Sequence, residues 1–219
     1  MKNLKKNIKE KKQVMDRFNE VLINREWCIL FNLSKEQASN YGWIGGNRPS
    51  YFDDGFGKDL REHYIFLLTV QNPFNKDISY SIFIPSHSSI YFDNYKYPNS
   101  AIKLFEHPTS GESNIEERSD FFKNQMFIHH YKNCKDADAL EEDYLMKFGG
   151  KPNLIQNKTY YYQDLEKDGY KFLFQIEESG FLKFLKDNYI FNYGALYVYA
   201  KNIENCAVDD VIIGFWQFS

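Results

Sequence analysis

The sequence predicts an α+β fold that is mainly antiparallel sheet, with two related β-rich halves packed together and an N-terminal helix. Three observations predict it: short apolar runs of strand length, one amphipathic opening segment, and a weak internal repeat. The 219 residues, of which 43% are hydrophobic, are enough to bury a sizeable core. We therefore expect a single compact domain over residues 1–219.

The opening segment is predicted to be helical. Its apolar residues recur at spacings of three, four and seven, which places them on one helix face; they are Leu4, Ile8, Met15, Phe18 and Leu22. Lysines crowd the first turns, yet the net charge of the chain is only −3. Nucleic-acid binding needs a concentrated basic face, and a short basic run is typical of a solvated helix face. We expect neither nucleic acid nor a membrane as partner.

Targeting signals and cysteine usage indicate a cytoplasmic protein. The first residues lack the apolar stretch of a secretory signal, and the longest apolar runs, such as Val211–Ile213, are too short to span a bilayer. Cys28, Cys134 and Cys206 are odd in number and widely spaced, unlike a disulfide framework. Free thiols suit a reducing compartment, so we expect a cytoplasmic location.

Strand-length segments occupy most of the remaining chain. Apolar runs at 64–70 and 79–84 are both bounded by proline, and residues 72–77 between them have the composition of a hairpin loop. Further strands are predicted at 27–33, 90–92, 102–105, 126–131, 170–176, 195–200 and 211–218. We expect an exposed, mobile loop over 106–120 and a short acidic helix over 138–146.

Three short segments of the first half are echoed, in the same order, in the second half. They share a glycine pair followed by proline, then an apolar strand, then a second apolar strand. The matched ranges are 45–49 with 149–152, 66–70 with 172–176, and 82–84 with 196–198, about 104, 106 and 114 residues apart. We interpret the echo as a duplicated unit with halves at 27–105 and 126–218, each needing the other to bury its apolar face.

Three motifs of the second half carry a family resemblance. Residues 147–156 match a glycine-glycine-x-proline-x-x-isoleucine-glutamine motif, 172–176 match a strand ending in Gln-Ile, and 192–198 match a glycine turn before a strand. In these motifs the chain resembles the YwqG-like family, a bacterial domain of unknown function. The resemblance implies a β-rich fold of two related halves and, for some members, an immunity or antitoxin role beside a toxin. It implies no active site, and the first half departs from the pattern.

The residues of these motifs are expected to be structural. Gln156 and Gln175 are of a type that satisfies buried backbone groups. The others are glycines and prolines, which set the backbone conformation of turns; they are Gly45, Gly46, Pro49, Gly149, Gly150, Pro152 and Gly194.

The sequence contains no recognisable catalytic or metal-binding motif. His129 and His130 are adjacent, so on a strand they point to opposite faces, and with Cys134 they do not complete a four-ligand metal site. Neither a G-x-S-x-G elbow nor a phosphate-binding glycine loop is present. Adjacent carboxylates such as Asp53–Asp54 and Asp209–Asp210 are expected to be solvated. We therefore expect no catalytic residue, no metal and no cofactor.

One glycine-rich segment is a candidate binding surface. It contains Trp43, Arg48 and Tyr51, the three residue types that dominate interaction hot spots. The alternative, which we favour, is a loop whose aromatics cap the core. We predict a non-catalytic binding protein whose partner is another protein and, given the resemblance, an immunity protein that covers a toxin. The alternatives are an enzyme of unknown reaction with a pocket between the two halves, and a small-molecule or stress-related binding module. The oligomeric state stays open.

Overall fold

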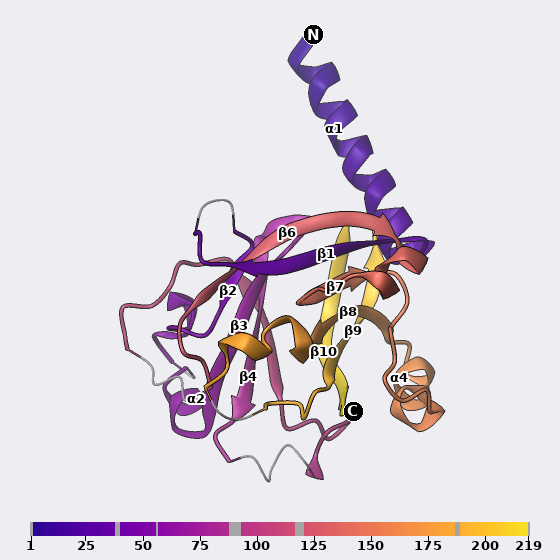
Figure 1. Cartoon of the computed structure of the whole chain (residues 1–219). Helices are drawn as coiled ribbons and strands as arrows, with labels where there is room; N and C mark the ends of the chain where they lie inside the picture. The colour runs from indigo at the N-terminus through magenta and orange to yellow at the C-terminus, as the bar shows by residue number, and fades with distance from the viewer. Residues whose placement is uncertain are drawn as a thin grey trace.

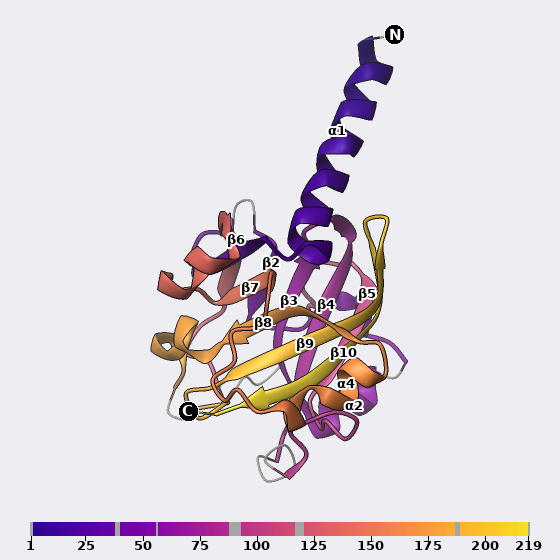
Figure 2. The ribbon, with the colours of Figure 1, turned by 90° about the vertical axis from the view of Figure 1, so that its right-hand side faces the viewer.

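A helical segment leads into a strand-rich body in the computed structural model of the chain (Figure 1). The structure describes residues 2–37, 40–55, 57–87, 93–116, 121–186 and 189–218, with side chains from Lys9 onward. α1 (Lys2–Phe18) passes directly into a π-helical turn, η1 (Asn19–Ile23). Phe18, Val21 and Leu22 are buried in the main core, whereas the rest of α1 points away from the sheet (Figures 1 and 2). No helix among the described residues is long and apolar enough to cross a membrane.

Across the residues that the structure describes, ten strands form one sheet in the order β10-β9-β8-β7-β1-β6-β2-β3-β4-β5. They are β1 (Trp27–Ser34), β2 (Gly42–Ile44), β3 (Tyr64–Asn72), β4 (Asn75–Pro85), β5 (Lys103–Pro108), β6 (Met126–Lys135), β7 (Met146–Gly149), β8 (Lys171–Glu177), β9 (Ala195–Glu204) and β10 (Ala207–Gln217). All neighbours are antiparallel. The edge strands β10 and β5 contact each other, so the sheet is nearly closed (Figure 2).

The strand order is symmetric: if each of β1–β5 is exchanged with the corresponding strand of β6–β10, the same order results, read from the opposite edge of the sheet. β1 and β6 lie side by side at the centre, and each pairs on its other side with the opposite half: β1 with β7, and β6 with β2. The first strand of each half is thus exchanged, and the two halves share one sheet. The predicted α+β, mainly antiparallel fold with an N-terminal helix is confirmed.

The sheet register agrees with the sequence echo at its first two matches. Trp43 of β2 lies opposite Thr69 of β3, and Lys147 of β7 lies opposite Gln175 of β8. The echo places the same residues in equivalent positions, because it aligns 45–49 with 149–152 and 66–70 with 172–176. The glycine pairs therefore follow equivalent strands.

At the third match the echo finds the correct strand but the wrong register. Leu68 pairs with Ile82, and the equivalent Phe174 pairs with Val198, whereas the echo had aligned Ile82 with Leu196. A slip of two residues leaves every side chain on the same face of the sheet. Apolar periodicity could not have detected it.

The two faces of the curled sheet have separate apolar clusters. The inner face holds the main core, which includes Ile44, Leu68, Ile82, Phe148, Phe174, Val198 and Trp216. On the outer face of the first half, Phe66 and Phe83 pack with residues of η2 (Ser50–Phe52) and α2 (Gly57–His63). On the outer face of the second half, Phe172, Tyr199 and Phe215 pack with residues of η4 (Thr159–Tyr161) and α4 (Gln163–Lys167). Each half thus covers its outer face with one 3₁₀ turn and one short helix.

Two local predictions need correction. The acidic segment forms a 3₁₀ helix, η3 (Asp136–Glu141), and the chain then enters β7, so no α-helix spans 138–146. β5 extends to Pro108, and Glu112 then forms a β-bridge with Pro49. This part of the expected mobile loop therefore lies against the turn that follows the first glycine pair, Gly45 and Gly46. The predicted strand at 90–92 lies outside the described residues.

Candidate functional site

Two equivalent rows of side chains cross the outer face of the sheet. Sheet pairing defines the first-half row as Phe127, Trp43, Thr69, Ser81 and Phe105. It defines the second-half row as Leu30, Lys147, Gln175, Tyr197 and Phe215. The backbone places corresponding residues alike, so differences between the rows come from side-chain size and polarity.

The second-half row holds the chain's own segment 151–156 against the sheet. Gln175 Oε1 accepts a hydrogen bond from the Asn153 backbone N–H at 2.7 Å, and the Tyr197 hydroxyl donates to the Asn153 carbonyl at 2.7 Å. Gln217 accepts from the Gln156 backbone N–H at 3.1 Å and donates to its carbonyl at 2.8 Å. Side-chain amides and a hydroxyl therefore satisfy the backbone of a segment that has no regular secondary structure.

Lys147 anchors the turn that leads into this segment. Its side chain is almost fully buried, with Nζ 2.6 Å from Asp136 Oδ1, and it donates to the Lys151 carbonyl at 2.7 Å. A buried cation needs such partners because desolvation is costly. A Cβ on Gly150 would lie 2.0 Å from Asp136 Oδ1, and the φ of Gly150 is +65°. The glycine therefore leaves room for the ion pair.

The first-half row leaves an open groove in the corresponding region. Trp43 Nε1 donates to the Asn47 carbonyl at 2.7 Å, and Glu112 Oε1 accepts from the Asn47 backbone N–H at 3.0 Å. Between the strands and segment 109–112 lies a groove of about 360 Å³, which we call the first-half groove. Its lining is Gln37, Asn40, Tyr41, Gly42, Trp43, Thr69, Gln71, Ser79, Thr109, Ser110, Gly111, Glu112 and Phe127.

The lining of the first-half groove combines aromatic and uncharged hydrogen-bonding side chains. Tyr41, Trp43 and Phe127 supply the aromatic surface. Gln71 contributes an amide, while Ser79 Oγ and Thr109 Oγ1 lie 2.7 Å apart. Aromatic surface with a few placed polar groups is the usual composition of a recognition site.

The structure separates the three predicted binding residues. Trp43 lines the groove and is half-buried. Tyr51 is 44% exposed and stacks on the His107 ring at 4.9 Å, and its backbone N–H donates to Ser110 Oγ. Arg48, by contrast, is fully buried, and its Nη1 donates to the Gly57 carbonyl at 2.6 Å. Arg48 therefore binds backbone of its own chain and offers no exposed surface in the free protein, and its predicted contact with a partner stays a prediction.

Sequence reasoning missed the polar side of the groove. Thr109, Ser110 and Glu112 fell inside a segment interpreted as an exposed, mobile loop. Gln71 carried a signal that was available: the echo aligns it with Glu177, which follows Gln175 in the second half. Extending the echo past its apolar residues would have drawn attention to it.

A buried histidine lies beneath the groove. His107 Nδ1 lies 2.8 Å from the Pro108 carbonyl, which only accepts, so Nδ1 carries the proton. Nε2 lies 2.7 Å from the Ser81 hydroxyl oxygen, and that hydroxyl donates to Thr69 Oγ1 at 2.9 Å. Burial lowers the pKa of His107, which keeps the ring neutral. Ser81 is fully buried, so this pair stabilises the sheet and does not present a nucleophile.

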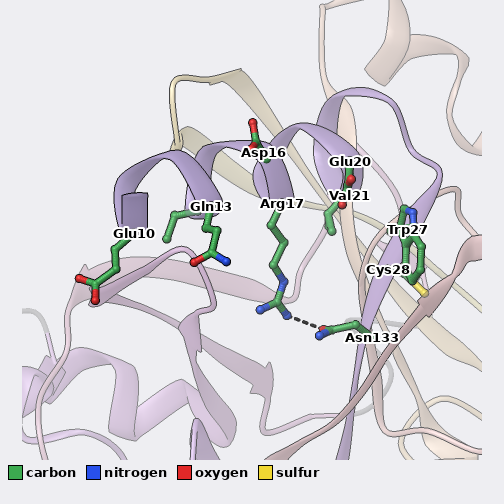
Figure 3. A pocket seen from close by; sticks show the side chains of 10 residues that line it. Glu10, Gln13, Asp16, Arg17, Glu20, Val21, Trp27, Cys28 and Asn133 are labelled. Atoms are coloured by element: carbon green, nitrogen blue, oxygen red, sulfur yellow. Dashed lines mark hydrogen bonds between the residues drawn. The ribbon is translucent and has the colours of Figure 1, made fainter. Parts of the chain in front are cut away.

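A further groove, of about 590 Å³, lies beneath α1 (Figure 3). Arg17 of α1 donates to Asn133 of β6 across it, and Trp27 and Cys28 of β1 form its far end. It borders the central strand pair β1–β6, which joins the two halves. If the chain were an enzyme with a pocket between its halves, the pocket would be expected at this place. Its carboxylates, Glu10, Asp16 and Glu20, belong to exposed residues of α1 and η1.

The adjacent histidines have separate partners. His129 Nε2 lies 2.6 Å from the Glu36 carbonyl, while His130 Nε2 lies 3.0 Å from Asn133 Oδ1. Cys134 is buried beside Cys28. Within the described ranges, no group of three or more His, Cys, Asp or Glu side chains is arranged to hold a metal ion.

The chain was compared with family models, with curated proteins and with solved structures. No family model, no curated protein and no solved structure matches it. The YwqG-like resemblance therefore stays a prediction, and the function has to be argued from the site itself.

Proposed function

We propose that this chain is a non-catalytic binding protein that holds an extended segment of a partner protein in the first-half groove. One observation carries the proposal: the related second half already binds a segment without regular secondary structure, its own residues 151–156, on the equivalent face. There, Gln175 and Tyr197 bind both backbone groups of Asn153. In the first half the equivalent residues are the smaller Thr69 and Ser81, and Thr69 lines an open groove.

The groove offers the chemistry that backbone recognition requires. Gln71 can donate and accept hydrogen bonds, which matches the alternating N–H and C=O groups of an extended chain. The hydroxyls of Ser79 and Thr109 can accept, because Thr109 donates its proton to the Lys76 carbonyl and Ser79 donates to Thr109 Oγ1. Trp43 adds apolar surface of the kind that dominates hot spots. Glu112 adds a negative charge, so a partner segment with Lys or Arg is favoured.

In its finer form, the proposal makes the partner a toxin that this chain covers. Support comes from the YwqG-like resemblance, because some members of that family resemble immunity proteins. The acidic balance of the chain, with 30 Asp and Glu against 27 Lys and Arg, suits a basic partner.

The proposal is tested by selecting peptides from a displayed library on the purified chain and measuring their affinity for variants. Gln71→Ala removes one of the side-chain amides that line the groove, and we expect about a tenfold loss of affinity, or ~1.4 kcal/mol. Gln163→Ala makes the same change at an exposed residue of α4 and should leave affinity unchanged. Trp43 fluorescence should respond to binding.

A second pair of variants distinguishes binding at the rim of the groove from non-specific binding to exposed aromatic side chains. Tyr51→Ala removes a 44% exposed ring next to the groove, and Tyr160→Ala removes a 40% exposed ring in the second half. Tyr51→Ala should weaken binding and Tyr160→Ala should not. The proposal is wrong if the selected peptides bind all four variants as tightly as the unchanged chain.

A further inference from the structure

Two cysteines from different halves face each other across the central strand pair. Cys28 of β1 lies directly opposite Cys134 of β6, and their Sγ atoms are 3.6 Å apart. Opposed residues in an antiparallel pair have Cα atoms about 4.5–5.5 Å apart, within the range of about 4.4–6.8 Å that disulfides span. Both thiols are free. Closing a bond between them therefore requires side-chain rotation and no movement of either strand.

The thiol pair lies under a thin cover on the outer face of the sheet. It belongs to a small apolar cluster with Leu30, Ala139 and Tyr144, separate from the main core. Ala139 belongs to η3, a 3₁₀ helix, and short elements with few apolar contacts open locally at low free-energy cost. On the other side, Cys28 lies at the end of the groove beneath α1 (Figure 3).

We propose that Cys28 and Cys134 form a redox modification site that a hydroperoxide closes into a disulfide between the two halves. One thiol, as thiolate, attacks a peroxide oxygen; the O–O bond breaks, and the leaving oxygen takes a proton. The product is a sulfenic acid and, from hydrogen peroxide, water. The second sulfur then attacks the first, the S–O bond breaks, the S–S bond forms and water leaves. Two thiols are oxidised and one peroxide is reduced to two waters.

The buried environment of the two thiols determines the rate of this reaction. Burial and the contact with Cys134 raise the pKa of the Cys28 thiol, and the thiolate is the reactive form. Closure is therefore slow at neutral pH and accelerates as the pH rises. Once closed, the bond joins residues 106 positions apart and fixes the exchanged first strands to each other.

The test treats the reduced full chain with hydrogen peroxide, blocks remaining thiols with an alkylating reagent, and measures intact mass and linked peptides. We expect the alkylated thiols to fall from three to one and the chain to lose two hydrogens. A peptide pair joined through Cys28 and Cys134 should appear, while Cys206 stays alkylated. Cys206→Ser should close as the unchanged chain does.

Two further measurements keep the outcome unambiguous. Cys28→Ser removes one sulfur, so Cys134 should stop at a sulfenic acid that a dimedone probe traps. Raising the pH should speed closure in the unchanged chain. The proposal is overturned if Cys206 reacts while the other two thiols remain alkylated, if the chain gains oxygen atoms without a linked peptide, or if the linked peptide contains Cys206.

Discussion

The two halves of the sheet have equivalent backbone positions, but the side chains at these positions have different roles. In the second half, Gln175 and Tyr197 reach the segment that follows the glycine pair and hold it against the sheet. In the first half, Thr69 and Ser81 are too short to do so, and a groove remains. The comparison teaches that strand order and register are shared, whereas side-chain size in one row decides whether that row reaches and binds a segment of its own chain.

The largest expected effect comes from the glycine pairs that start the two turns. Gly149 has φ +77°, and a Cβ there would lie 2.1 Å from Val21 Cγ1 and 2.8 Å from its carbonyl oxygen. Gly45 has φ +68°, and its Cβ would meet Phe122 at 3.0 Å. We expect Gly149→Ala to lower the free energy of unfolding by about 3–4 kcal/mol, since overpacking adds to left-handed strain. Gly45→Ala should cost about 1–2 kcal/mol. Urea unfolding of both variants measures the difference.

This pair of variants sharpens the comparison because the backbone conformations are alike. If Gly45→Ala proved as damaging as Gly149→Ala, the first-half turn would be packed as tightly as the second, contrary to the account given above.

An intermediate effect is expected in the rows themselves. Gln175→Ala would leave the Asn153 backbone N–H without its partner, and an unsatisfied buried group costs about 1–3 kcal/mol. Thr69→Ala removes a contact to the Ser81 hydroxyl at 2.9 Å and should cost about 1 kcal/mol. Amide exchange should report where each variant acts: Gln175→Ala should expose segment 151–156, and Thr69→Ala should leave that segment protected. Equal exposure of the segment in both variants would contradict the assigned roles.

Much of the sheet could be predicted because its strands are indicated by local sequence patterns. Runs such as 64–70 and 79–84 are apolar and bounded by proline, and each lies within a strand. The repeat was also visible, since glycine pairs and apolar strands recur in order. The exchange of β1 and β6 was not predictable, because it depends on pairing between residues about a hundred positions apart, which no local pattern encodes.

The site was less predictable, since sequence does not show burial. Arg48 beside Trp43 in a glycine-rich segment has the composition of a hot spot, yet its guanidinium is buried against Gly57. Lys147 gives no sign of being buried, because its partner Asp136 becomes adjacent only through the pairing of three strands. Polar residues acquire their roles from tertiary neighbours.

A smaller effect is expected in the pH dependence of stability, because the buried His107 belongs to the first half. Burial lowers the pKa of His107 below the unfolded value of 6.5, so the unfolded chain binds a proton that the folded chain does not. Stability is therefore lost as the pH falls below about 6.5. We expect the free energy of unfolding of His107→Gln, measured by urea unfolding, to fall less than that of the unchanged chain between pH 7 and pH 5, the difference being at most about 2 kcal/mol. A difference that did not vary with pH would show that His107 does not titrate on unfolding.

The occupied second-half row and the unoccupied first-half row are tested most directly by amide hydrogen exchange of the full chain, free and with a selected peptide. We predict that 151–156 is protected in both states, whereas 109–112 gains protection only with peptide bound. Protection of 109–112 in the free chain that is equal to that of 151–156, with no change on binding, would contradict the account.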